Sequence, residues 1–194
     1  MRTINHRKLT IKRESNSTKE INKKPEYIYA LKHYYIDENE DQAIEQLKQI
    51  CTSDHDDARF FLGYLLKEVK KQPAEAVKVF EPLAQKGDIE AQFYMGFTCA
   101  VDLREYEKAA IYHEMAANQG CIESLFYMGI IYKYDIPDID RAVTWFEKAA
   151  REGYSRAMYE LYLTYRDHYK NNEQAEFWKE KYVGSIALNR EFTV

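Results

Sequence analysis

Apolar and polar residues follow each other along most of this chain with the spacing of amphipathic helices. In the segment 106–117, Ala109, Tyr112, His113 and Ala116 recur at i, i+3, i+4 and i+7, which places them on one face of a helix. A second apolar segment, 91–99, comes before it, and a short polar stretch separates the two. The pattern therefore predicts a pair of helices, called helix A (91–99) and helix B (106–117), joined by a tight turn.

The same pattern recurs every 33 residues. Five columns of mostly small or apolar residues keep this spacing: Ala43, Ala76, Ala109, Ala142 and Ala175; Ala58, Ala91, Ser124 and Ala157; Leu62, Met95, Met128 and Leu161; Ala30, Gly63, Gly96 and Gly129; and Asp54, Gly87, Gly120 and Gly153. A fixed period of this length indicates a repeat architecture in which each unit is one supersecondary element. The last column follows helix B, where a chain leaving a helix takes a left-handed conformation that suits Gly.

The period predicts an all-α fold, an α-solenoid of about five helix–turn–helix repeats of 33 residues. The repeat domain is expected at 25–189, with units 25–57, 58–90, 91–123, 124–156 and 157–189. Residues 1–24 are expected to form a basic, flexible tail, and a structural cap on the first unit is the alternative. Residues 190–194 are expected to be a C-terminal tail.

These columns resemble the Sel-one-like repeat family, a relative of the tetratricopeptide repeat. The family pattern is roughly Ala-x-Tyr-x-Leu-Gly-x-x-Tyr, a turn, and then an aromatic residue and Ala-Ala-x-x-Gly at the end of helix B. Residues 91–96, 145–153 and 157–161 match it. The A–B loop is shorter here than is usual in the family, and the paired Cys of its secreted members are missing. The resemblance implies a right-handed superhelix with the A helices on its concave face. Family members act as scaffolds and adaptors for protein partners.

The resemblance also implies roles for single positions, counted from the first residue of each unit. Three glycines at position six of helix A are expected to face the alanines of helix B in the same unit: Gly63, Gly96 and Gly129 face Ala76, Ala109 and Ala142. Positions four and seven are expected to line the concave groove. Position four holds Phe61, Tyr94, Tyr127 and Glu160, and position seven holds Tyr64, Phe97, Ile130 and Leu163. Because aromatic side chains are common interface anchors, this groove is expected to bind an apolar or helical segment of a partner. Packing of the rings between neighbouring A helices is the alternative.

Charge is distributed unevenly along the chain. Residues 1–24 hold eight Lys/Arg and two acids, a balance of +6, whereas the remainder holds 20 Lys/Arg and 30 acids, a balance of −10. An acidic body is a poor surface for nucleic acid, which needs clustered positive charge, so no nucleic-acid partner is expected. No apolar run is long enough to cross a membrane.

No motif for catalysis or for a cofactor is recognised. The five His match no metal-ligand spacing, and Cys51, Cys99 and Cys121 match neither a metal site nor a disulfide framework. His113 shares its column with Leu47, Phe80 and Phe146, so it is interpreted as a core residue. We therefore expect no metal, no cofactor and no enzymatic activity, and three cysteines without a disulfide framework favour a cytoplasmic location.

The sequence thus predicts a scaffold or adaptor whose concave groove binds a segment of a protein partner. The identity of the protein partner does not follow from the residues, and self-association stays open. One alternative is an immunity or inhibitor protein that masks a toxin or an enzyme, with the acidic body meeting a basic partner. A small hydrolase is a second alternative, although no residues are identified that would carry catalysis.

Overall fold

The computed structural model describes residues 25–51 and 55–191, and every regular element in these ranges is helical. The elements are α2 (Pro25–Tyr35), α3 (Glu40–Ile50), α4 (Asp56–Glu68), α5 (Pro73–Gln85), α6 (Ile89–Phe97), the π-helical segment η1 (Thr98–Leu103), α7 (Tyr106–Asn118), α8 (Ile122–Ile130), the π-helical segment η2 (Ile131–Asp135), α9 (Ile139–Arg151), α10 (Ser155–Asp167) and α11 (Asn172–Glu191). The predicted all-α repeat fold is confirmed. Residues 1–24 and Asp54 lie outside the described residues.

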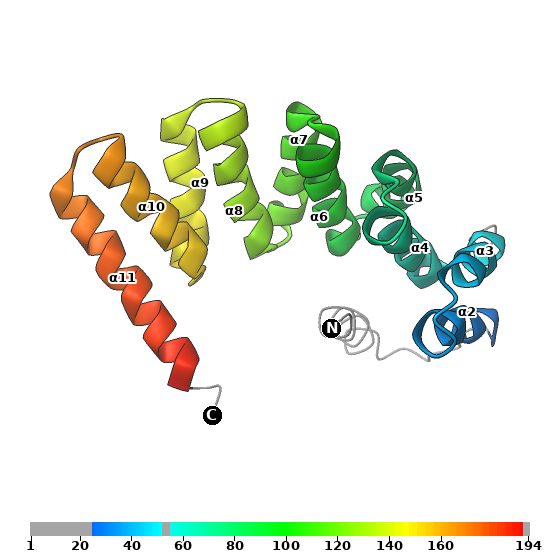
Figure 1. Cartoon of the computed structure of the whole chain (residues 1–194). Helices are drawn as coiled ribbons and strands as arrows, with labels where there is room; N and C mark the ends of the chain where they lie inside the picture. The colour runs from blue at the N-terminus through cyan, green and yellow to red at the C-terminus, as the bar shows by residue number, and fades with distance from the viewer. Residues whose placement is uncertain (1–24, 52–54, 192–194) are drawn as a thin grey trace. The chain divides into compact units, whose positions relative to one another are not determined.

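The helices keep the 33-residue register closely. The A helices α4, α6, α8 and α10 begin at Asp56, Ile89, Ile122 and Ser155, and the B helices α3, α5, α7, α9 and α11 begin at Glu40, Pro73, Tyr106, Ile139 and Asn172. In Figure 1, α6 and α7 form one A–B pair, and α8 and α9 form the next. The last helix continues to Glu191, beyond the expected end of the fifth unit at 189.

The contacts divide the chain into two compact units, residues 1–58 and 59–194. In the first unit, α2 packs on α3 and buries Tyr27, Ala30 and His33. In the second unit, each helix from α5 to α11 packs on the next one along the chain. Its core includes Ala142, Phe146, Ala149, Ala157 and Leu161, all inaccessible to solvent. Apolar burial of this kind is the main stabilising contribution.

Every A helix ends in the same hydrogen-bonded turn. A backbone N–H donates to a carbonyl six residues earlier in all five units: Asn39 to His33, Gln72 to Leu66, Glu105 to Cys99, Asp138 to Tyr132 and Asn171 to Tyr165, at 2.7–2.9 Å. This bond spans one residue more than the 6→1 bond of a Schellman motif, and its donor directly follows a left-handed residue in four of the five units. Glu38, Lys71, Arg104 and Lys170 occupy that left-handed position, with φ of 50–58°. In the fourth unit the position is Pro137, whose ring excludes positive φ.

The B helices end at the predicted glycines. Gly87, Gly120 and Gly153 have φ of +90°, +91° and +83°, and no atom lies within 4 Å of the place where a Cβ would stand. Backbone conformation, and not crowding, therefore selects Gly at the end of helix B.

The glycines inside the A helices have a different neighbour from the one expected. A Cβ built on Gly63 or Gly96 would stand 2.7 Å from the ring of Phe80 or His113, and one on Gly129 would meet the ring of Phe146. The expectation that these glycines face Ala76, Ala109 and Ala142 is therefore wrong about the nearest contact. The alanines are fully buried, but the residue one turn further along helix B lies over the glycine. An aromatic ring needs the space that a missing Cβ leaves.

Candidate partner-binding face

Positions four, seven and eleven of each A helix lie on one side of it, because three or four residues make one helical turn. The A-helix face is defined here as this row of side chains on α6, α8 and α10 with the adjoining η1 and η2, all in the second compact unit. Its residues are Tyr94, Phe97 and Val101 from α6 and η1; Tyr127, Ile130 and Tyr134 from α8 and η2; and Glu160, Leu163 and Asp167 from α10. The face is thus apolar on α6 and α8, and it becomes polar on α10.

The aromatic residues at position four pack against the preceding repeat. The Tyr94 ring stacks on Phe80 of α5, with ring centres 5.6 Å apart, and the Tyr127 ring stacks on His113 of α7 at 5.4 Å with an angle of 9° between the planes. Burial raises the pKa of both hydroxyls, and the carboxylates of Glu68 and Glu90 raise that of Tyr94 further. Packing between repeats, the alternative to partner binding, therefore covers a large part of the surface of these two rings. The fourth member of this column, Phe61, is buried.

The residues at position seven are partly exposed. Tyr64, Phe97, Ile130 and Leu163 are all half-buried. Phe97 stacks on Phe93 at 6.1 Å and meets Tyr127 edge-on at 5.3 Å. The contact between Phe97 and Tyr127 thus joins apolar side chains of α6 and α8.

Sequence reasoning missed position eleven, which is the most exposed part of this row. Val101 and Tyr134 are more than half exposed, and they lie one turn beyond Phe97 and Ile130. The signal was present, because position eleven continues the i, i+3, i+7 spacing of positions four and seven. It was overlooked because the column reads Glu68, Val101, Tyr134 and Asp167 and so has no uniform chemistry.

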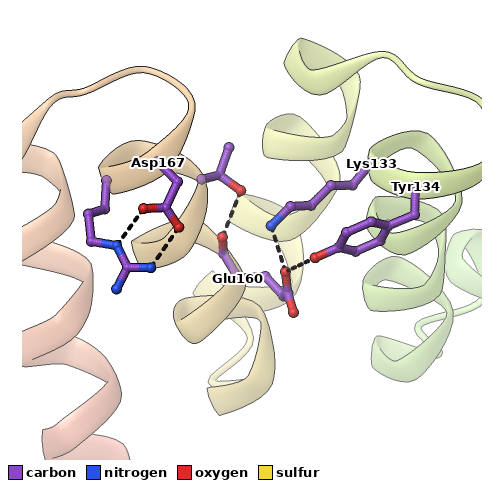
Figure 2. Close-up of polar contacts among 6 residues, drawn as sticks. Lys133, Tyr134, Glu160 and Asp167 are labelled. Carbon is purple, nitrogen blue, oxygen red and sulfur yellow. Dashed lines mark hydrogen bonds and ion pairs between the residues drawn. The ribbon is translucent and has the colours of Figure 1, made fainter.

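A polar cluster joins η2 to α10 (Figure 2). The Lys133 ammonium lies 2.8 Å from Oε2 of Glu160, and the Tyr134 hydroxyl donates to the same oxygen at 3.1 Å. The Lys133 and Glu160 side chains are only 12% and 16% exposed. An ion pair that is largely removed from water is screened less by salt than a surface pair. Glu160, at position four, therefore links two repeats where the preceding units use aromatic stacking.

A second lysine at the same repeat position makes an analogous link. Lys67 lies two units before Lys133, and its ammonium contacts Glu68 at 2.6 Å and Asp102 of η1 at 3.4 Å. The same ammonium stands 4.7 Å from the centre of the Phe97 ring. The charged groups of these two clusters are thus paired with one another, so the A-helix face offers apolar contact area more than net charge.

The histidine interpreted as a core residue is buried. The His113 side chain has no solvent exposure, and its Nδ1 lies 3.3 Å from the Ser124 hydroxyl. Burial lowers its pKa to about 3. The ring is therefore neutral at neutral pH, and it packs between Gly96 and Tyr127 without access to a substrate.

Other candidate chemistry is sparse in the part of the chain that the structure describes. No three His, Cys, Asp or Glu side chains there gather as potential metal ligands. The three cysteines form no disulfide with one another, and burial raises the pKa of the Cys99 thiol to about 11. Among the described helices, none has the length and apolar character of a membrane span.

Three solved structures have folds similar to that of this chain. MamA has a TM-score of 0.69 and 17% identity, over 80% of this chain and 93% of that one. A Sel1 repeat protein from Oxalobacter formigenes has a TM-score of 0.56 and 21% identity, over 82% of this chain and 72% of that one. A protective antigen with the SLR fold, from uropathogenic Escherichia coli, has a TM-score of 0.58 and 20% identity, over 73% of this chain and 33% of that one.

These similarities define the class of the fold. No family model matches the sequence, and no curated protein is significantly similar to it. The chain is an α-helical repeat protein with the Sel1-like repeat fold, as the resemblance of its sequence predicted.

Proposed function

We propose that this chain is a protein-interaction module that binds a segment of a partner on its A-helix face. The observation that carries the proposal is the apolar row at positions seven and eleven on two neighbouring repeats: Phe97 and Val101, then Ile130 and Tyr134. Exposed apolar side chains that gather on one face are typical of binding surfaces. The Sel1-like repeat fold, whose members are mostly interaction scaffolds, supports the same proposal.

The proposal modifies the predicted set of binding residues. Phe61 is buried, and Tyr94 and Tyr127 contribute to packing between repeats, so their replacement would lower stability together with affinity. Val101 is the better probe, because its side chain is 56% exposed and it is not part of a stack. Ile111 on α7 is a matched control: it is 58% exposed and belongs to a B helix.

The test compares Val101→Asp with Ile111→Asp in the full chain. Partners are first captured from the native organism with the unchanged protein and identified by mass spectrometry. The affinity of each captured partner for the unchanged chain, Val101→Asp and Ile111→Asp is then measured by calorimetry. Thermal melts of the same three proteins are recorded in parallel. We expect Val101→Asp to weaken binding about tenfold or more, since a centrally placed anchor contributes roughly 1.4 kcal/mol or more. Ile111→Asp should leave the affinity unchanged. Loss of affinity with Ile111→Asp alone would place the interface on the B helices.

The captured partner also tests the alternative functions. An immunity or inhibitor protein would abolish the activity of its partner when the two are mixed in equal amounts, whereas a scaffold would leave that activity in place. Binding of proteins, without catalysis, is the function we propose, and a cytoplasmic location stays a prediction.

A further inference from the structure

The last helix, α11, packs on α10 with one side and leaves another side open (Figure 1). On the packed side, Ala175 is buried, and Trp178 and Tyr182 contact the core of the second compact unit. Phe177 lies on the open side and is 45% exposed. It begins a set of four exposed residues at i, i+3, i+4 and i+7, a spacing that places them on one helical face. This set, called the α11 row, comprises Phe177, Glu180, Lys181 and Gly184.

Gly184 differs from the other glycines of this chain. It lies inside α11, where glycine favours a helix less than alanine does. The glycines that end the B helices have a positive φ, and those inside the A helices lie under aromatic rings. Gly184 shows neither feature, because its φ is outside the left-handed range and no described atom lies within 4 Å of the place where a Cβ would stand. The space beside it is therefore open to a group from another molecule.

Phe177 is a ring of the kind that fills such a space in the repeats. Inside the second repeat, the Phe80 ring lies over Gly63 from the neighbouring helix. Phe177 does not lie over Gly184 of its own chain, because two helical turns, about 10.5 Å of rise, separate the two residues. The Phe177 ring of a second copy has no such restriction.

The charges between Phe177 and Gly184 are arranged symmetrically. When two copies of a helix pair about a two-fold axis, residue i of one contacts residue j of the other, and j contacts i. In an antiparallel pair whose axis passes midway between residues 180 and 181, Phe177 stands opposite Gly184 of the second copy. The same axis places Glu180 opposite Lys181 of the second copy. Within one chain the Lys181 ammonium lies 5.5 Å from the centre of the Phe177 ring, so these two side chains are neighbours on the same face. One arrangement therefore satisfies both the ring and the charges.

We propose that the α11 row binds the α11 row of a second copy of this chain, as an antiparallel pair with two-fold symmetry. Each Phe177 ring fills the space over the other copy's Gly184, and two Glu180–Lys181 ion pairs lie between the rings. The missing Cβ lets the two helices approach to the near end of the usual range of about 8–10 Å between axes. With one ring from each copy the interface is small, and small interfaces are typical of weak, reversible complexes. The row belongs to a B helix, so the proposal does not depend on the A-helix face or on a partner bound there.

Sedimentation equilibrium of the full chain tests the proposal, at protein concentrations up to roughly 1 mM so that a weak dimer is detected. Glu180→Lys and Lys181→Glu each place like charges opposite one another, and either change should raise the dissociation constant of the dimer about tenfold or more. An equimolar mixture of these two variants should associate again, because one copy then carries two positive charges and the other two negative charges. Lys148→Glu, which alters an exposed lysine in the same repeat column on α9, is the control and should associate like the unchanged chain.

A change at Gly184 separates association from folding. Leucine favours a helix more than glycine does, and its Cβ would meet no described atom within 4 Å, so Gly184→Leu should keep or raise the melting temperature of the dilute protein. The same side chain would take the place of the second copy's Phe177 ring, so the dissociation constant should rise about tenfold or more.

Three results would overturn the proposal. The first is an unchanged chain that stays monomeric at the highest concentration. The second is a dimer that Gly184→Leu and both charge variants leave equally tight, since the interface would then lie elsewhere. The third is loss of association in the charge variants without recovery in their mixture, since the antiparallel two-fold arrangement would then be wrong.

Discussion

At the scale of single residues, a large side chain on one helix of a repeat packs against a small residue on the other. Rings on helix B lie over glycines on helix A in the three central units, where Phe80, His113 and Phe146 cover Gly63, Gly96 and Gly129. In the first unit the same two columns hold Leu47 and Ala30, and in the last they hold Lys179 and Tyr162. The glycine is thus required only where helix B brings a ring.

This matching gives a prediction for Gly96. Gly96→Ala should lower the free energy of unfolding by about 1–3 kcal/mol, because the added methyl group would stand under 3 Å from the His113 ring. In a His113→Leu background, which copies the Ala–Leu pair of the first unit, the same change should cost much less. Urea unfolding of the two single variants and the double variant measures the coupling. Strictly additive losses would contradict the contact.

The buried imidazole also predicts how stability depends on pH. His113 has a pKa of about 3 in the folded state, and 6.5 is the ordinary value. Between these values the unfolded chain binds a proton that the folded chain does not, so stability falls as the pH falls from about 6.5 towards 3. The slope is at most about 1.4 kcal/mol per pH unit. The groups that face the ring are Phe93, Tyr127 and Ser124, none of them charged at these pH values.

Urea unfolding from pH 7 to pH 4 checks this prediction. His113→Phe, which restores the ring of the other units, should make the pH dependence shallower by close to that slope. His168→Gln, at an exposed histidine, is the control and should change it little. An unaltered pH profile in His113→Phe would show that acid sensitivity arises from carboxylates elsewhere.

At the scale of elements, the backbone conformation of the turn between helix A and helix B is more uniform among the repeats than the residues that form it. Glu38, Lys71, Arg104 and Lys170 share a left-handed backbone and have no glycine among them. A side chain in this conformation costs roughly 1–2 kcal/mol relative to its preferred one. The turn persists because its hydrogen bond to the carbonyl six residues earlier and the start of helix B fix both of its ends.

Arg104→Gly should therefore stabilise the protein by about 0.5–1 kcal/mol, since relief of the left-handed strain exceeds the greater freedom of Gly in the unfolded chain. Arg104→Ala is the matched control and should have almost no effect, because Ala keeps the Cβ. Thermal melts of both variants decide the matter. A lower melting temperature for Arg104→Gly would mean that the arginine side chain makes a stabilising contact.

At the scale of the whole molecule, the repeats of the second compact unit contact chiefly their neighbours, and the stability of that unit depends on the interfaces between its repeats. Within the second compact unit these interfaces use different chemistry along the chain. Rings stack at Tyr94 and Tyr127, whereas the Lys133–Glu160 ion pair makes the next link. Lys179 then takes the ring position in α11, with Glu176 at 2.8 Å from its ammonium. A charge in this column disfavours stacking of a further repeat.

Loss of one stack should weaken cooperativity as well as stability. Tyr127→Ala is expected to cost about 2–4 kcal/mol, as for other large-to-small changes at partly buried rings. It should also let α10 and α11 open separately from α6 and α7. Hydrogen exchange in moderate urea, read helix by helix, measures this. Uniform acceleration of exchange in all helices would show that the second unit still unfolds as one body.

The sequence alone determined the repeat, the alternation of A and B helices and the glycines that end the B helices. These features depend on local backbone requirements and on which residues share a helical face, and both are visible at 33-residue spacing. The α11 row could not be seen in this way, because Phe177 and Gly184 stand in columns with no uniform chemistry.

Only the tertiary structure decided which side chains of the A helices are covered. Tyr94 and Tyr127 are of the residue type that often anchors a binding partner. In the structure, however, a ring of the preceding B helix packs against each of them and covers much of its surface. Val101 and Tyr134 had no distinctive column, but they are the exposed part of the same row. The tertiary structure likewise showed that each A-helix glycine lies under the ring of helix B, one helical turn beyond the alanine that the sequence indicated. In each case the outcome depends on how far one helix is shifted along its neighbour, a quantity that periodicity within a single helix does not contain.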